Sequence, residues 1–149
     1  MKTIKIIIDK DIMEKYEVDY FKLNPRCRVF PKYFKNPIPM SLNTFLNLKR
    51  EAQGTVKSKY KDFAVWLAKQ YGISERNFED IKVTYDFYFG IIRKRDVDNY
   101  VMANKLLMDG FVSADVLIDD NSKHLALQFN PFKLDRKNPR VELTFDIIK

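Results

Sequence analysis

The run from Ile81 to Ile91 alternates strictly between apolar and other side chains, and it constrains the fold more than any other segment of the chain. Apolar or aromatic residues stand at every second position: Ile81, Val83, Tyr85, Phe87, Phe89 and Ile91. Because successive side chains of a β-strand point to opposite faces of a sheet, this pattern predicts a long strand with one buried face. The chain must therefore build a sheet and cover one face of it.

Other segments predict the rest of the sheet and the helices that cover it. Shorter alternating runs predict strands over residues 3–8, 125–129 and 141–147. Between Val56 and Tyr71, apolar residues recur at steps of three and four, which predicts an amphipathic helix ending at Gly72. A second helix is expected from the aspartates near residue 96 to about Met108, with Gly110 as its stop signal.

The remaining segments give weaker patterns. Residues 9–36 show no clear period and are expected to be irregular, apart from a short strand near Arg28–Phe30. Pro37 and Pro39 predict an extended segment, because a proline disfavours helix at the residue before it. No repeat or linker divides the 149 residues. We therefore expect one α+β domain over residues 1–149, with a mixed sheet of about four strands and two main helices on one face.

The cysteine content and the hydropathy bear on where the protein acts. Cys27 is the single cysteine, so no disulfide can form within the chain, and a reducing cytoplasm is expected. The apolar run over residues 4–8 is too short for a membrane span, and no membrane partner is expected.

Charge is distributed unevenly along the chain. The net charge is +7, but the stretch from Lys22 to Lys61 holds ten basic residues and one acidic residue, which gives +9 (10 − 1). Between Asp96 and Asp120 lie six aspartates and no glutamate. A basic stretch favours a polyanion, because neutralising phosphates releases counterions, although it could equally be a solvated surface that keeps the protein soluble.

Two pairs of carboxylates are candidates for a metal site. Asp96 and Asp98 follow a predicted strand, and Asp119 and Asp120 precede the next one. The pairs can meet if the strands are neighbours, and clustered carboxylates need a cation to stay ionised together. Hard oxygen ligands prefer Mg²⁺, with Mn²⁺ as a substitute. As an alternative, each pair alone is typical of a helix cap or a turn.

The order of these motifs resembles the RusA family of Holliday junction resolvases, which are small endonucleases often encoded by phages. The resemblance lies in the segment RDVDN from Arg95, the helix carrying Lys105, the Asp119–Asp120 pair, and the upstream segment PIPMSLN at residues 37–43, which is similar to a P-x-x-SLN segment of the family. It covers about three quarters of the chain, from Pro37 onward, and leaves residues 9–36 unmatched.

The resemblance implies a homodimer that cuts four-way DNA junctions in recombination and repair, with Mg²⁺ as its cofactor. It assigns the metal ligands to Asp96, Asp98 and Asp120, with Asp119 as a possible substitute, and a catalytic role to Lys105. The family lysine usually follows the second aspartate by four residues, where this chain has Met102. Lys105 follows by seven and shares a face with Asp98 if the helix is regular.

Basic residues beside these motifs are candidates for phosphate contacts. The expected DNA-binding residues are Arg93, Lys94, Arg95, Lys49, Arg50, Lys57, Lys59 and Lys61. Two other interpretations remain open. One is a non-catalytic nucleic-acid-binding dimer in which the aspartates only cap helices and turns. The other is a nucleotide-sugar transferase, although the chain is short for one and has no evident nucleotide-binding turn.

Overall fold

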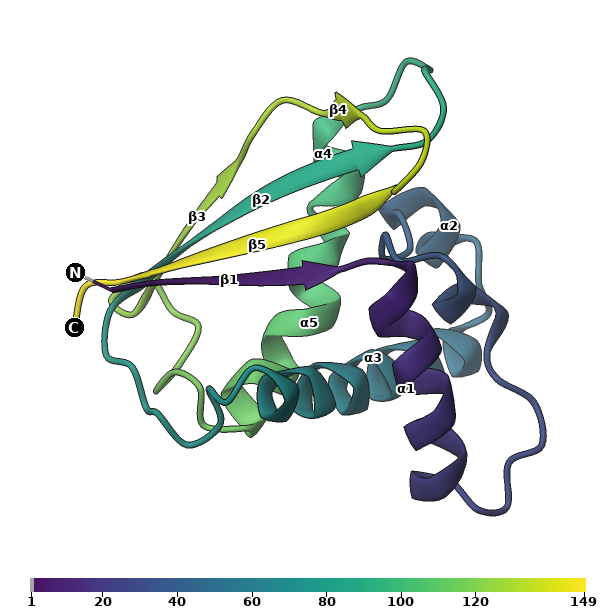
Figure 1. Ribbon diagram of the computed structural model, residues 1–149, viewed down its shortest axis with the longest axis horizontal. Helices are drawn as coiled ribbons and strands as arrows, with labels where there is room; N and C mark the ends of the chain where they lie inside the picture. Colours follow the sequence, from purple (N-terminus) through teal and green to yellow (C-terminus); the bar gives the residue numbers. More distant parts are fainter. Residues whose placement is uncertain (1) are drawn as a thin grey trace.

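Five strands form one mixed sheet in the computed structural model, which describes residues 2–149 (Figure 1). The strands are β1 (Lys2–Ile8), β2 (Ile81–Phe89), β3 (Leu125–Phe129), β4 (Lys133–Leu134) and β5 (Arg140–Ile147). Their order is β1-β5-β2-β3, and β4 also pairs with β2. β5 is antiparallel to both β1 and β2, whereas β3 and β4 are parallel to β2. The mixed α+β sheet is confirmed. The strand beyond the predicted four is β4, which is too short to produce an alternating pattern.

The alternation of β2 sorts its side chains between the two faces as predicted. Ile81, Val83, Tyr85 and Phe87 are fully buried on the face that meets the helices. Ile91 is instead 64% exposed, because the strand ends at Phe89 and the chain turns away. The apolar face of β2 therefore forms the centre of the core, together with the matching positions of β1 and β5.

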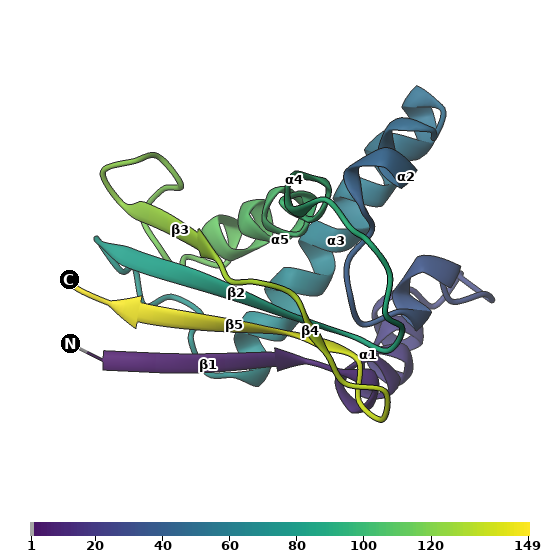
Figure 2. The same ribbon diagram turned by 90° about the horizontal axis from the view of Figure 1, so that it is seen from above.

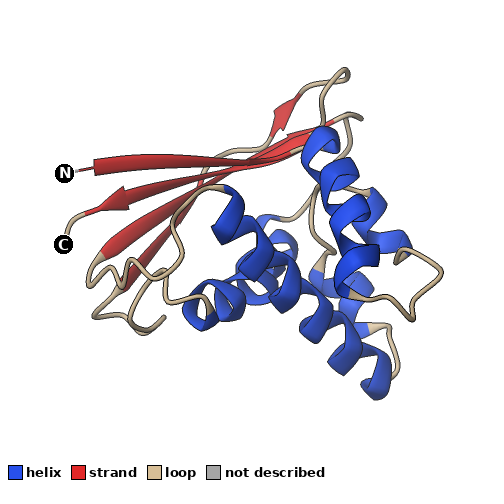
Figure 3. Cartoon of the chain, turned by 60° about the horizontal axis from the view of Figure 1, so that its bottom comes forward, coloured by secondary structure: helices blue, strands red, loops and turns tan. Residues whose placement is uncertain are grey.

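The helices lie on one side of the sheet (Figure 3). They are α1 (Lys10–Leu23), the short 3₁₀-helix η1 (Lys32–Lys35), α2 (Leu42–Leu46), α3 (Arg50–Gln70), α4 (Val97–Tyr100) and α5 (Met102–Ser113). Among residues 2–149 the long helices number three rather than the predicted two, because α1 was not expected. Over residues 2–149, no helix combines the length and the apolar character needed to cross a membrane.

The N-terminal region corrects the prediction for residues 9–36. Asp9 caps α1 by accepting a hydrogen bond from the Ile12 amide at 3.0 Å. Only Met13, Tyr16 and Tyr20 of this helix are buried, so its apolar stripe is too narrow to stand out in a charged sequence. No strand forms at 28–30. The loop there is held instead by the buried Phe30, whose ring packs against other aromatic side chains.

The crossing of α3 and α5 corrects the prediction for Gly110. This glycine lies inside α5, which continues to Ser113, and does not stop the helix. A Cβ atom built on Gly110 would lie 2.5 Å from both the Ala64 Cβ and the Lys61 carbonyl oxygen of α3. The glycine is therefore required for the close approach of the two helices, which cross beneath the sheet (Figure 2).

Candidate functional site

A hollow of about 400 Å³ between α2, α3 and α5 brings together two of the predicted site residues, Lys105 and Asp120. Lys57 of α3 and Asp109 of α5 also line it. Its apolar lining is formed by Leu42, Phe45, Leu46, Met102 and Met108. A second hollow beside it is lined by Lys61, Asp109, Asp119 and Asp120. Lysines from two helices therefore lie close to three carboxylates.

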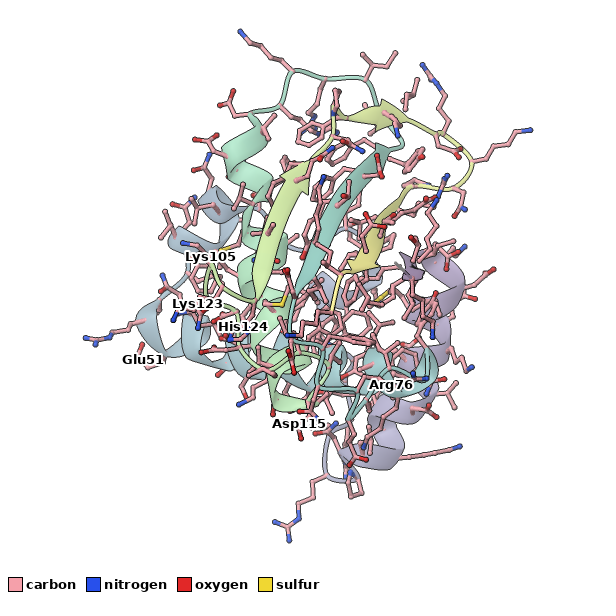
Figure 4. All side chains as sticks on the ribbon, turned by 90° about the vertical axis from the view of Figure 1, so that its left-hand side faces the viewer. Glu51, Arg76, Lys105, Asp115, Lys123 and His124 are labelled. Carbon is pink, nitrogen blue, oxygen red and sulfur yellow. The ribbon has the colours of Figure 1, made fainter. Side chains whose placement is uncertain are left out.

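The exposed side of α5 explains why Lys105 and Asp109 reach the same hollow. Both are exposed, while Leu106, Leu107 and Phe111 are buried against the sheet and α3. Residues four apart on a helix are neighbours on its surface. Lys105 lies on the same side of the molecule as Lys123 and His124 of the loop before β3 (Figure 4). Asp109 was not among the predicted site residues, although its spacing of four residues from Lys105 indicates that the two share a helix surface.

The loop before β3 gives its two aspartates different surroundings. The Asp119 carboxylate accepts hydrogen bonds from the Asp120 amide at 2.8 Å and from the Asn121 side chain at 3.1 Å. The bond from the Asp120 amide is the main reason that the pKa of Asp119 is lowered. Asp119 is thus engaged within its own turn, whereas Asp120 lines the hollow that also contains Lys105. This difference favours Asp120 as the functional member of the pair.

Asp96 and Asp98 lie elsewhere. Both are exposed at the start of α4, and neither lines the two hollows that contain Asp120. The strands β2 and β3 are neighbours, as the sequence analysis required, but they are parallel. The end of β2 and the start of β3 therefore lie at opposite ends of the sheet. Adjacent strands alone do not bring the two aspartate pairs together.

The predicted metal site depends on carboxylate side chains. Carboxylate oxygens are suitable ligands for Mg²⁺. Among residues 2–149, however, no group of three or more His, Cys, Asp or Glu side chains is arranged to hold a metal ion. The donor type fits a divalent cation, but the spacing in this conformation does not, and the metal site stays a prediction.

The helical segment that links the DVDN motif, residues 96–99, to Lys105 is not regular. Val101 separates α4 from α5, and the Asn104 amide bonds to the Val101 carbonyl three residues back. The expected common face of Asp98 and Lys105 assumed an unbroken helix, so it does not follow here. Met102, at the usual position of the family lysine, is only 4% exposed and belongs to the core. Lys105 is therefore the more accessible of the two positions.

A hydrogen bond joins two segments that carry the resemblance. The Asn99 side-chain oxygen accepts from the Asn43 backbone amide at 2.8 Å, across 56 residues of sequence. Asn99 closes the DVDN motif, and Asn43 closes the SLN segment at the start of α2. The Ser41 side chain caps the same helix by accepting from the Thr44 amide. The DVDN turn is thereby fixed to the N-terminal turn of α2.

The expected DNA-binding residues fall into separate groups. Lys57 and Lys61 line the hollows beside α5, but Lys59 points toward α1, with its amine 5.0 Å from the Tyr20 ring centre. Lys49 and Arg50 are exposed at the start of α3. The loop after β2 carries the rest of the set: Arg93 and Lys94 are exposed, and Arg95 is half-buried. Lys59 is thus separated from the other basic residues.

In comparisons with known proteins, no family model matches the chain and no curated protein matches it. The likeness to the RusA family therefore rests on the motif residues of the sequence.

Proposed function

We propose that this protein is a structure-specific endodeoxyribonuclease that resolves four-way DNA junctions in recombination and repair. The observation that carries the proposal is the hydrogen bond from the Asn43 amide to the Asn99 side chain. It joins the two segments whose order resembles the RusA family, and a chance likeness of short motifs gives no reason for them to meet.

The surface beside these segments supports a role in binding DNA. Lys57, Lys61 and Lys105 come from two crossing helices and surround hollows on one side of the molecule. Cations spaced along such a surface suit a phosphate backbone, since each phosphate contact releases counterions. The carboxylates of Asp109 and Asp120 lie among these lysines. A surface that only bound DNA would gain nothing from placing bare carboxylates there.

The proposed cofactor is Mg²⁺, with Mn²⁺ as a substitute, and the proposed ligands are Asp96, Asp98 and Asp120. Because these residues are not gathered in the structure, no chemical step is assigned to the metal. Lys105 is proposed to lie beside the phosphate that is cut, where its charge would stabilise developing negative charge. A homodimer is proposed because one cutting site in each subunit, related by a two-fold axis, suits symmetrical cuts in opposed strands.

A non-catalytic nucleic-acid-binding protein is the second candidate. The observation that favours it is that no three potential metal ligands come together within the described part of the chain. In this case Asp96 and Asp98 act only on the start of α4, where negative charge is favourable.

Incubation with a labelled synthetic four-way junction separates the two candidates. The junction and a linear duplex of the same sequence are incubated with Mg²⁺, Mn²⁺ or EDTA. The nuclease produces symmetrical nicks in the junction, in the metal lanes only. Salt-sensitive binding with intact strands in every lane would instead support the binding protein.

A further inference from the structure

A pocket of about 390 Å³ lies on another side of the DVDN turn, lined by aromatic and basic residues. Tyr33 of η1 and Tyr100 of α4 provide aromatic walls, and Phe89 at the end of β2 also lines the pocket, with the Arg95 guanidinium over its ring. Arg93 and Arg95 line it from the loop that follows β2. Its volume is within the usual range for small-ligand sites, about 300–1,000 Å³. It contains none of the residues of the hollows beside α5.

The Arg95 guanidinium is held in place with hydrogen-bonding capacity to spare. Its central carbon lies 3.9 Å from the centre of the Phe89 ring, and one terminal nitrogen donates to the Ile91 carbonyl at 3.0 Å. Its Nε is buried and has no hydrogen-bond partner among the residues that the structure describes. Arginine carries five N–H donors in a rigid plane, so an acceptor in the pocket could bind donors of the terminal nitrogens other than the one given to Ile91, while the enclosed Nε stays within the fold.

The charge of the lining selects the class of ligand. Within the described part of the chain, the pocket is lined by two arginines and by no aspartate or glutamate. Asn36, Ser41 and Thr44 also line the pocket. Aromatic rings suit the flat face of a base, and a fixed guanidinium suits a phosphate or a base edge. A single nucleotide supplies all of these features.

We propose that this pocket binds one nucleotide extruded from the DNA near the branch point, with its base against the aromatic walls and its phosphate on Arg93 and Arg95. The inference rests on the proposed function for the presence of DNA. Since Arg95 directly precedes Asp96, a nucleotide held here lies near one of the proposed metal ligands. Pulling a base out of the stack is least costly where pairing is already disturbed, as it is at a junction.

The test uses the full chain and ligands small enough to enter the pocket. Deoxynucleoside monophosphates and inorganic phosphate are titrated separately, and binding is followed through backbone amide NMR signals. We expect saturable shifts at the pocket residues and nucleotide binding about tenfold tighter than phosphate binding, because base stacking adds to the charge interaction. Equal affinity for the two ligands, or nucleotide shifts confined to other surfaces, would overturn the proposal.

Three variants localise the binding. Arg95→Ala removes the fixed guanidinium, and Arg93→Ala removes an exposed cation that packs less into the fold. Lys35→Ala is the matched control, because it removes an exposed positive charge from η1, beside the pocket but outside its lining. Both arginine variants are expected to weaken nucleotide binding about tenfold, and the control less than twofold. An equal loss in all three would show a general charge effect and contradict the pocket.

Failure of the nuclease can be told apart from failure of the pocket. Wild-type protein that binds nucleotides as described but never cuts a junction contradicts only the nuclease. Protein that cuts junctions but shows no nucleotide binding at these residues contradicts only the pocket.

Discussion

The Asn99 side-chain oxygen lies 2.8 Å from the Asn43 backbone nitrogen and accepts its hydrogen bond. The bond connects the turn that carries Asp96 and Asp98 to the N-terminal turn of α2. One wall of the hollow containing Lys105 and Asp120 is also formed by α2. The DVDN turn and the hollow containing Asp120 thus both adjoin α2, and the bond joins the DVDN turn to this helix.

Removing the bond tests its importance. Asn99→Ala is expected to lower the free energy of unfolding by about 0.5–1.5 kcal/mol, the usual net value of one hydrogen bond. Junction cleavage is expected to fall by a larger factor, because the DVDN turn loses its fixed orientation. Thr3→Ala is the matched control, since it removes an exposed hydrogen bond from Thr3 of β1 to Asp146 of β5. Equal cleavage by the two variants would contradict the positioning role.

A pair of glycine substitutions tests the crossing of α3 and α5. Gly110→Ala is expected to destabilise the fold by about 1–3 kcal/mol, because the new methyl group collides with Lys61 and Ala64. Gly54→Ala should stabilise it by about 0.5–1 kcal/mol, since Gly54 lies inside α3 with nothing within 4 Å of its Cβ position. Urea denaturation measures both changes. A neutral effect of Gly110→Ala would show that the two helices are not this close.

Glu142 gives a pH dependence whose sign can be worked out. Burial opposes ionisation of this carboxyl group, but the hydrogen bonds from Lys5 and Arg140 outweigh it and lower the pKa below its usual value. Because this pKa is lower in the folded state than in the unfolded state, the ionised carboxylate stabilises the fold above the unfolded-state pKa of about 4. This stabilisation is lost as the pH falls through the lower, folded-state pKa.

Glu142→Gln is therefore expected to lower the free energy of unfolding at neutral pH by about 1–3 kcal/mol. The difference from wild type should shrink steadily below about pH 4, where the wild-type carboxyl becomes protonated. Glu51→Gln, at an exposed position in the first turn of α3, is the control. It should leave the fall in the free energy of unfolding at acid pH unchanged. A constant difference between Glu142→Gln and wild type across this range would contradict the assigned pKa direction.

The lysines around the two hollows are expected to set the affinity for DNA. Lys57→Gln and Lys61→Gln should each weaken junction binding and reduce the slope of log affinity against log salt by about one. Lys137→Gln is the control, because Lys137 is exposed in the loop before β5 and lines neither hollow. Fluorescence anisotropy at several salt concentrations gives the slopes. Equal slopes in all three variants would place DNA on another surface.

Features encoded locally were predicted well from the sequence. The alternation through Ile81, Val83 and Tyr85 predicted the central strand because it depends only on which side chains face the core. By contrast, α1 was missed because its three buried residues stand among many charged ones, although Met13, Tyr16 and Tyr20 do recur at helical spacing after a capping aspartate. The role of Gly110 was also missed, because a close helix crossing leaves no local pattern.

The candidate site was predicted only in part, for a related reason. Motif order predicted Lys105 and Asp120 as site residues, and the fold brings both to one hollow. Whether Asp98 meets Asp120 depends on strand direction and on the course of the loop before β3, which are properties of the whole fold. The contact between Asn43 and Asn99 likewise spans too much sequence for any local pattern to indicate it.

The most direct test of the proposed nuclease is to measure cleavage and binding together for Asp98→Asn. Asp11→Asn, an exposed aspartate in the first turn of α1, is the matched control. With Mg²⁺ and a labelled four-way junction, wild type and Asp11→Asn are predicted to make symmetrical nicks. Asp98→Asn should make none while binding the junction with an affinity close to that of wild type. Cleavage by Asp98→Asn at the wild-type rate, or intact strands with every protein, would contradict the account.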